Sequence, residues 1–270
     1  MTTGALIFAF NNEKTDYVGM AEWCAKNVRR HLDIPVAVVT DCDDISRLGS
    51  FDKVIKAVPS SGGSRYFEDY QTHATWYNAG RTDAYSVTPW DQTLVLDSDF
   101  VVNSPAMKHL FELDKDFLCH RHSFDITNPD GSFMPTFGKH NFPMWWATVM
   151  LFRKSNTAQY IFDCMHMIRE NWQHYRDLYG IYPDTYRNDF ALSIALGIVS
   201  GHTNSVDAIP WNMPATLPEH QLSAAGNREL RIWEVKYKNA ENKLNTFGFA
   251  GQDFHAMGKR DLGVIIEQDH

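Results

Sequence analysis

The sequence carries two aspartates, Asp97 and Asp99, two positions apart within the apolar run 94–102 (Leu-Val-Leu-Asp-Ser-Asp-Phe-Val-Val). A carboxylate in apolar surroundings costs several kcal/mol unless a cation or hydrogen-bond donors compensate its charge. Because parallel α/β sheets bind ligands at the carboxyl ends of strands, two carboxylates at a strand end are placed to meet one. Their oxygen atoms suit Mg²⁺ or Mn²⁺, and such an ion can bind a diphosphate and stabilise it as a leaving group.

A three-residue Asp-x-Asp match is also common by chance. The alternative interpretation is a strand followed by a turn in which Asp97 and Asp99 accept hydrogen bonds from backbone amides. The apolar residues on both sides of the motif favour a metal site over this alternative. The position of the motif after two or three strand–helix units favours it as well.

Strands and helices alternate in the first part of the chain. Apolar stretches predict buried strands over 4–10 and 34–40, and a more polar strand over 51–58. Apolar residues at helical spacing predict a helix over 15–32, with Thr15 as its N-cap. A strand, a crossover helix and a second strand give a right-handed connection and parallel pairing. The pattern therefore predicts the nucleotide-binding half of an α/β fold.

The rest of the chain is less regular and contains no linker between domains. We therefore expect residues 1–270 to form a single α/β domain with a mostly parallel central sheet flanked by helices. The other elements expected are an exposed loop over 62–70, a helix over 72–86, a helix that begins at Ser104-Pro105, a long loop over 124–143, a strand over 146–152, helices over 156–178 and 188–196, and strands between Leu230 and His255 that complete the sheet.

Composition limits the class of protein and its partners. Hydrophobic residues make up 44% of the 270 residues and charged residues 21%, as in soluble globular proteins. The net charge of -8 provides no basic surface of the kind that binds nucleic acids without regard to sequence. The apolar N-terminal stretch has no basic residue before it and stops at Asn11, so we expect neither a signal peptide nor a membrane span, and a cytoplasmic location.

The spacing of cysteines and histidines gives little support to other metal sites. The four cysteines lie far apart with no Cys-x-x-Cys pair, which predicts reduced, partly buried thiols rather than a zinc knuckle or a disulfide framework. His120 and His122 have the His-x-His order that a metal can use, but their neighbours supply no third ligand. We therefore expect these two histidines to be solvated or satisfied within the core.

Several further motifs follow one another along the chain. They are Phe8-Ala9-Phe10-Asn11-Asn12, Ala79-Gly80-Arg81-Thr82-Asp83, Asp97-Ser98-Asp99, Arg187-Asn188-Asp189-Phe190-Ala191-Leu192 and His255-Ala256-Met257-Gly258-Lys259-Arg260. In this order they resemble the nucleotide-sugar transferases of the GT-A fold, and within them glycosyltransferase family 8, which includes glycogenin and bacterial galactosyltransferases. The resemblance covers most of the chain. The family's strand Asn-x-Gly-Val-x-Leu corresponds to 146–151, which lacks its Asn and Gly.

The resemblance implies a role for each matched residue. Asp97, Asp99 and His255 would be the three protein ligands of one Mn²⁺ or Mg²⁺ ion. Lys259 would contact the diphosphate, with Arg260 as the alternative, because the lysine stands directly after the glycine and the family's Pro-Trp is absent. The residues implied in binding the donor are Phe10, Asn11, Asn12, Tyr17, Arg81, Ser98, Gly258 and Lys259.

The function implied by the resemblance is that of a metal-dependent glycosyltransferase. It would move a hexosyl or pentosyl group from a nucleotide-diphosphate sugar, which we expect to be a UDP-sugar, to an acceptor with retention of anomeric configuration. Asn188 and Asp189 would face the sugar and the acceptor and steady the developing oxocarbenium charge. Their alternative role is to cap the helix that runs to Leu196.

Two other functions use similar residues. A nucleotidyltransferase also uses paired aspartates and Mg²⁺ on an α/β sheet, but usually with a Gly-rich, basic segment near the first strand, which 8–12 lacks. A noncatalytic nucleotide-sugar-binding module is disfavoured by the presence of Asp97, Asp99 and His255 together. The acceptor stays open between small glycans, lipid-linked sugars, proteins and hydroxylated bases in viral DNA. An acidic chain without a membrane helix disfavours lipid and DNA.

Overall fold

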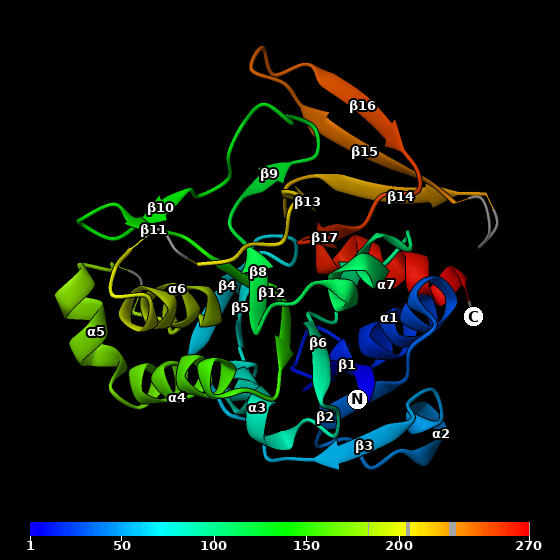
Figure 1. Cartoon of the computed structure of the whole chain (residues 1–270). Coiled ribbons are helices and arrows are strands. Elements are labelled where there is room, and N and C mark those ends of the chain that lie inside the picture. Colours follow the sequence, from blue (N-terminus) through cyan, green and yellow to red (C-terminus); the bar gives the residue numbers. More distant parts are fainter. Residues whose placement is uncertain (183, 204–205, 227–230, 270) are drawn as a thin grey trace.

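A central sheet of six strands runs through the computed structural model, which describes residues 1–182, 184–203, 206–226 and 231–269 (Figure 1). The strands are β1 (Thr3–Phe8), β2 (Val36–Thr40), β3 (Lys53–Lys56), β6 (Gln92–Leu96), β8 (Phe117–His120) and β12 (Trp146–Arg153). Their order is β3-β2-β1-β6-β12-β8. The first four pair in parallel, whereas β12 is antiparallel to both β6 and β8. The expected α/β fold with a mostly parallel central sheet is confirmed.

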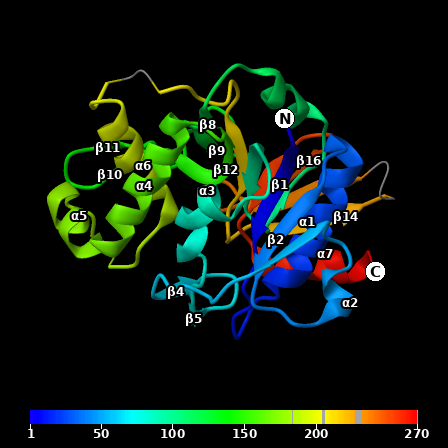
Figure 2. The same ribbon diagram turned by 60° about the horizontal axis from the view of Figure 1, so that its bottom comes forward.

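Helices lie on both sides of this sheet. They are α1 (Tyr17–Leu32), α4 (Asn156–Glu170), α6 (Asn188–Val199) and α7 (Lys259–Gln268). Helix α1 connects β1 to β2 and lies beside α7, while α4 and α6 pack together on the opposite side of the central strands (Figures 1 and 2). Because both faces are covered, every residue of β2 and β6 is buried. The main hydrophobic core lies between these layers.

A smaller sheet brings the C-terminal part of the chain to the Asp-x-Asp motif. Its strands are β7 (Phe100–Val101), β9 (Ser123–Asp125), β13 (Met213–Thr216) and β17 (Phe254–Ala256), in the order β7-β17-β13-β9. Strand β7 begins directly after Asp99, and β17 pairs antiparallel with it. This pairing carries His255 to the turn that holds the two aspartates.

The other C-terminal strands form a separate antiparallel sheet, seen at the top of Figure 1. It consists of β14 (Gln221–Ala225), β15 (Ile232–Lys238) and β16 (Leu244–Phe249). The expectation that strands between Leu230 and His255 complete the central sheet is therefore wrong, and Leu230 itself lies outside the described residues. Most side chains of β16 are exposed, which a strand covered on both faces by helices could not accommodate.

The segment between β3 and β6 begins with a hairpin. β4 (Ser64–Phe67) and β5 (Thr72–Thr75) pair antiparallel, and a 3₁₀ helix, η1 (Ala79–Asp83), and α3 (Ala84–Val87) follow. The expectations of an exposed loop over 62–70 and of a helix over 72–86 are therefore wrong for the residues of β4 and β5. Gln71 closes the turn with a φ of +51°, and Gly62 lies so close to Trp76 that a Cβ would stand 2.0 Å from the indole. Long-range packing on this indole therefore outweighs the local helical pattern.

Several boundaries differ from expectation by a cap or a break. Asp16, not Thr15, caps α1, because its carboxylate accepts a hydrogen bond from the N–H of Gly19 at 3.2 Å. The helix expected over 156–178 ends at Glu170, and α5 (Trp172–Tyr179) begins after Asn171. The helix expected after Ser104-Pro105 is a 3₁₀ helix, η2 (Ala106–Glu112).

The remaining short elements are α2 (Ile45–Leu48), β10 (Thr136–Phe137) and β11 (Phe142–Pro143). The last two pair inside the long loop expected over 124–143. All four cysteines are free thiols, as predicted. Among the helices of the described ranges, none combines the length and the apolar character needed to cross a bilayer.

Candidate active site

The turn between β6 and β7 carries the two aspartates of the motif. The N–H of Asp97 donates to the carbonyl of Thr148 on β12 at 3.0 Å, and the N–H of Phe100 donates to the carbonyl of Asp97 at 3.0 Å. The turn therefore holds both carboxylates at the carboxyl end of β6, where parallel α/β sheets bind ligands. Only 5% of Asp99 is exposed, so its charge requires a partner.

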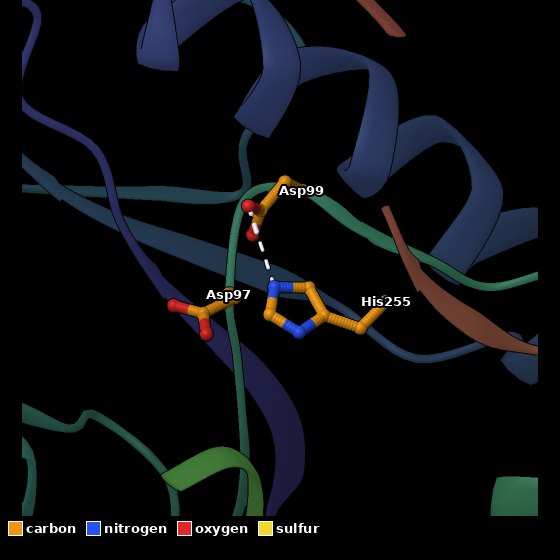
Figure 3. Close-up of side chains that lie close together, drawn as sticks. All are labelled: Asp97, Asp99 and His255. Carbon is orange, nitrogen blue, oxygen red and sulfur yellow. Dashed lines mark ion pairs between the residues drawn. The ribbon is translucent and has the colours of Figure 1, made fainter. Parts of the chain in front are cut away.

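His255 reaches the same point from β17 (Figure 3). The pairing of β17 with β7 sets His255 opposite Phe100, and the N–H of Ala256 donates to the carbonyl of Asp99 at 3.0 Å. The Nε2 atom of His255 lies 3.4 Å from Oδ2 of Asp99. One ligand atom from each of Asp97, Asp99 and His255 lies within 4.8 Å of the others, so the three can share one ion.

Two cations neutralise these carboxylates. The Nζ atom of Lys259, at the start of α7, lies 2.7 Å from Oδ2 of Asp99. The buried guanidinium of Arg81 pairs with the carboxylate of Asp97 and donates to the carbonyl of Ala147 at 2.8 Å. Burial lowers the pKa of Arg81 to about 10, which leaves it protonated at neutral pH. Both carboxylates are thus held in place before any ligand binds.

Asp99 is an anion despite its burial. Burial alone would raise its pKa, but the charge of Lys259 and the hydrogen bonds from Lys259 and His255 outweigh burial and hold the pKa of Asp99 well below its usual range. Two carboxylates and one imidazole form a donor set that suits Mn²⁺ or Mg²⁺. The residues present therefore fit a divalent ion, and three protein ligands leave coordination positions for oxygen atoms of a substrate.

A cavity of about 500 Å³ opens beside this cluster. Its wall includes the rings of Phe10, Tyr17 and Trp76. Burial raises the pKa of Tyr17 to about 12, so the phenol stays protonated and can donate a hydrogen bond. A cavity of this size with aromatic walls and a few charged groups is typical of a small-molecule site.

Most of the residues predicted for the site line this one cavity. They are Phe10, Tyr17, Arg81, Asp97, Ser98, Asp99, Asn188, Asp189, His255 and Lys259. Arg260, the alternative to Lys259, is exposed, and its Nε atom lies 3.4 Å from the carboxylate of Asp261. Lys259 is therefore the cation that the fold directs toward Asp99.

The other three residues predicted to bind the donor, Asn11, Asn12 and Gly258, are not among the described residues that line the cavity. The side chain of Asn11 accepts a hydrogen bond from the N–H of Val18, and that of Asn12 donates to the carbonyl of Thr75. Gly258 is the N-cap residue of α7. The roles of these three residues in donor binding stay predictions.

Asn188 and Asp189 lie at the start of α6. The carboxylate of Asp189 accepts one hydrogen bond from the N–H of Ala147 at 3.0 Å and one from Arg187 at 2.9 Å. Burial alone would raise the pKa of Asp189, but Arg187 and the hydrogen bond from Ala147 lower it below its ordinary value. The amide of Asn188 donates to the carbonyl of Asn78 at 2.9 Å, and its Oδ1 atom is buried without a hydrogen-bond partner among the described residues.

Two further cations line the cavity, Arg65 and Arg187. Arg187 directly precedes the matched pair Asn188 and Asp189, so its position near the site could be predicted from the sequence. Arg65 lies on β4, in the segment expected as an exposed loop. The signal that could reveal it is the pairing of 64–67 with 72–75 across a short turn, which the helical spacing over 72–86 obscures.

His120 and His122 take no part in the cavity. His120 is buried on β8, and its Nδ1 atom lies 3.0 Å from the carbonyl oxygen of Trp211, whereas His122 is exposed. The expectation that each of these histidines is either satisfied within the core or solvated is therefore confirmed.

Comparison with known proteins gives structural likenesses only, since no protein-family model and no curated protein matches the chain. The apo form of the glycosyltransferase GlyE of Streptococcus pneumoniae TIGR4 is 13% identical, over 77% of this chain and 45% of its own, with a TM-score of 0.45. The galactosyltransferase LgtC, in complex with donor and acceptor sugar analogues, is 14% identical over 72% of this chain and 70% of its own, with a TM-score of 0.47. Mouse xyloside xylosyltransferase 1 is 15% identical over 75% of this chain and 83% of its own, with a TM-score of 0.43.

These structures are glycosyltransferases, the class that the sequence resembles. The 4-diphosphocytidyl-2C-methyl-D-erythritol synthase from Anaerococcus prevotii DSM 20548 also matches, at 10% identity over 77% of this chain and 86% of its own, with a TM-score of 0.36. The chain spans less than half the length of GlyE. With TM-scores below 0.5, the likenesses assign neither a substrate nor an activity to this chain.

Proposed function

We propose that this protein is a metal-dependent glycosyltransferase that takes its sugar from a nucleotide-diphosphate donor, a UDP-sugar. The observation that carries the proposal is the meeting of Asp97, Asp99 and His255 at the wall of a cavity of about 500 Å³. These residues would hold Mn²⁺ or Mg²⁺, which when bound supplies positive charge for a departing diphosphate.

Lys259 and Arg81 support this site in different ways. Burial alone would lower the pKa of Lys259, but the charge of Asp99 raises it above its ordinary value, so the ammonium stays protonated beside the position proposed for the diphosphate. Arg81 fixes the carboxylate of Asp97 and is itself fixed by the carbonyl of Ala147. Such support orients a ligand group before the substrate arrives.

The rings of Phe10 and Tyr17 are proposed to pack against the nucleoside. Both line the cavity with the metal cluster, and aromatic faces bind bases and sugars through packing with little loss of conformational freedom.

Asn188 and Asp189 are proposed to face the transferred sugar and the acceptor. The carboxylate of Asp189 stays ionised, so its charge can stabilise positive charge that develops on the sugar. The Oδ1 atom of Asn188 is available to accept a hydrogen bond from a sugar hydroxyl. We propose that the acceptor approaches from the face that the diphosphate leaves, so that the product retains the anomeric configuration.

The rival functions differ in the product that they release. A glycosyltransferase releases the nucleoside diphosphate from a nucleotide sugar, whereas a nucleotidyltransferase releases pyrophosphate from a nucleoside triphosphate and a sugar phosphate. A noncatalytic module releases neither. The transferred group, hexosyl or pentosyl, and the acceptor, whether a glycan, a lipid-linked sugar, a protein or a hydroxylated DNA base, are open within the proposal.

The test is a panel of UDP-, GDP-, CDP- and dTDP-sugars incubated with the protein and Mn²⁺, with release of the nucleoside diphosphate as the readout. Slow hydrolysis to water reports the donor even before the acceptor is known. We expect release from a UDP-sugar that stops when EDTA is added and returns with excess Mn²⁺. Release of pyrophosphate from a nucleoside triphosphate and a sugar 1-phosphate, with no release from any nucleotide sugar, would replace the proposal with nucleotidyl transfer.

A further inference from the structure

The guanidinium of Arg65 lies at the wall of the cavity on a rigid support. It stacks on the ring of Trp76, with 3.8 Å between its central carbon and the ring centroid. One of its nitrogen atoms donates to the carbonyl of Tyr186 at 3.3 Å. Stacking on an indole together with one backbone bond fixes the plane of the guanidinium while its other N–H groups remain available.

Among the described residues, Arg65 differs from the other arginine and lysine side chains of the cavity in having no carboxylate partner. Arg81 pairs with Asp97, Lys259 with Asp99, and Arg187 with Asp189. Within the part of the chain that the structure describes, no carboxylate lies within ion-pair distance of Arg65. A half-buried charged group beside a cavity ordinarily has a partner, so this one is placed for a ligand.

The pKa of Arg65 also indicates that its positive charge is not neutralised by the residues around it. Burial and then the charge of Arg187 lower the pKa of Arg65 to about 9, and Asp189 only partly opposes them. Both oxygen atoms of Asp189 are already engaged, one by the N–H of Ala147 and one by Arg187. An additional negative group beside Arg65 would therefore be stabilised rather than repelled.

Two neighbouring polar atoms also lack partners among the described residues. They are the Nε atom of Arg187, a donor, and the Oδ1 atom of Asn188, an acceptor, and both residues line the same cavity. A carboxylate flanked by hydroxyl groups meets all of these needs. It can accept a bidentate pair of bonds from a guanidinium, while a hydroxyl donates to the amide oxygen.

We propose that Arg65 binds a carboxylate on the sugar substrate, which makes a hexuronic acid the sugar that this site selects. The inference rests on the proposed function. The diphosphate is assigned to the neighbourhood of Asp99 and Lys259, so Arg65 is left for a further negative group. The carboxylate can belong to the transferred sugar or to an acceptor sugar, since both would lie beside Asn188 and Asp189.

Matched pairs of donors that differ only at C6 test the inference for the transferred sugar. Binding of UDP-glucose against UDP-glucuronate, and of UDP-galactose against UDP-galacturonate, is measured by calorimetry with Mn²⁺, and UDP is measured alone. We expect one acidic donor to bind about ten- to a hundredfold more tightly than its neutral partner, as for loss of a hydrogen bond to a charged group. Arg65→Met removes this preference and leaves the affinity for UDP unchanged, while Arg65→Lys keeps part of it.

Arg121→Met is the matched control. Arg121 also stacks on an indole, that of Trp145 at 5.3 Å, and donates to the carbonyl of Met144 at 2.7 Å, but it does not line the cavity. The control variant is expected to keep the preference for the acidic donor. Thermal midpoints of both variants show whether a loss of binding follows from a loss of folding.

A second pair of assays places the carboxylate on the acceptor if the donors are not distinguished. With the best donor, transfer to p-nitrophenyl glucuronide is compared with transfer to p-nitrophenyl glucoside, and a preference for the acidic acceptor that Arg65→Met abolishes supports the inference in its acceptor form. The inference is overturned if neither donors nor acceptors are distinguished by charge, or if Arg65→Met weakens binding of UDP and all UDP-sugars alike. If acidic and neutral nucleotide sugars bind equally well, the proposed glycosyltransferase function still stands. If no nucleotide sugar binds, both the proposed function and the carboxylate site at Arg65 are contradicted.

Discussion

The Nε2 atom of His255 lies 3.4 Å from Oδ2 of Asp99 because β17 pairs antiparallel with β7 and sets His255 opposite Phe100. The Asp-x-Asp turn is therefore completed by a strand from near the other end of the chain. The same pairing places α7 directly after the cluster, so that Lys259 also reaches Asp99. Metal ligands and the cation proposed for the diphosphate are thus positioned by one strand and the helix that follows it.

Divalent metal should stabilise the fold through these ligands. At about a hundred times its Kd, Mn²⁺ is expected to raise the thermal midpoint by about 5 to 10 °C, because binding to the folded state alone contributes about 2.7 kcal/mol. His255→Gln and Asp99→Asn should remove most of this shift, and Asp99→Ala should lower turnover more than Asp97→Ala does. A thermal-shift titration with MnCl₂ measures the first effect.

The matched control for the metal is a second histidine–carboxylate pair, in which Nε2 of His220 lies 3.6 Å from Oδ2 of Asp125. His220→Gln should keep the full metal-dependent shift. Equal loss of the shift in His220→Gln and His255→Gln, or activity that survives excess chelator, would contradict the assignment of Asp97, Asp99 and His255 as the ligands.

Lys259 should compete with the metal for Asp99. Its Nζ atom lies 2.7 Å from Oδ2 of Asp99, so Lys259→Met is expected to raise the affinity for Mn²⁺ about tenfold by removing a neighbouring positive charge. The same change should weaken binding of UDP about tenfold, because the diphosphate loses a cation. Calorimetry with each ligand separates the effects, and Arg260→Met, which changes an exposed neighbour, should alter neither. A fall in both affinities would show that Lys259 only holds the fold.

The central sheet could be predicted because its signals are local. The stretch over 4–10 is apolar and short, and its residues 4–8 lie in β1. Of the residues with helical spacing over 15–32, those from 17 to 32 form α1. Asp97 and Asp99 could be assigned to a strand end because carboxylates inside an apolar run have few other places in a fold. For these parts, periodicity and burial agree.

The parts that could not be predicted depend on contacts far apart in the sequence. The hairpin of β4 and β5 packs on Trp76, and the helical spacing over 72–86 obscures the local signal of its short strands. His255 could be linked to Asp99 only through a family resemblance, because its position depends on the pairing of β17 with β7. Arg65 follows from neither source, and only the folded hairpin brings it into the cavity.

Asp189→Asn should separate a role in turnover from a role in folding. The amide can still accept the hydrogen bond from Ala147, and Arg187 is partly exposed, so we expect only a small change in thermal midpoint. Turnover should fall by about two orders of magnitude if the negative charge faces the sugar. Initial rates at saturating donor measure this, and NMR of the product is expected to show retention.

The control for this variant is Asp177→Asn on α5, which removes another carboxylate paired with the preceding arginine. It should leave turnover unchanged. Unchanged turnover in Asp189→Asn, or a product of inverted configuration, would leave Asp189 as a residue that only ties α6 to β12 and would require a different group at the sugar.

His120 should make the stability of the fold depend on pH below neutrality. Burial lowers the pKa of this imidazole from its ordinary value of about 6.5 to about 4, which the bond to the carbonyl of Trp211 only partly offsets. Between these values the unfolded chain binds a proton that the folded chain excludes, so the free energy of unfolding falls as the pH decreases from 6.5 toward 4. The protonation of this one group lowers the free energy of unfolding by about 3 kcal/mol in total, and this full decrease is reached below pH 4. Urea denaturation at pH 7.0, 6.0, 5.0 and 4.5 measures how the free energy of unfolding declines over this range. His120→Gln should flatten the decline, whereas His174→Gln, at an exposed position, should not. Equal slopes in the unmodified protein and both variants would show that His120 is protonated in the folded state.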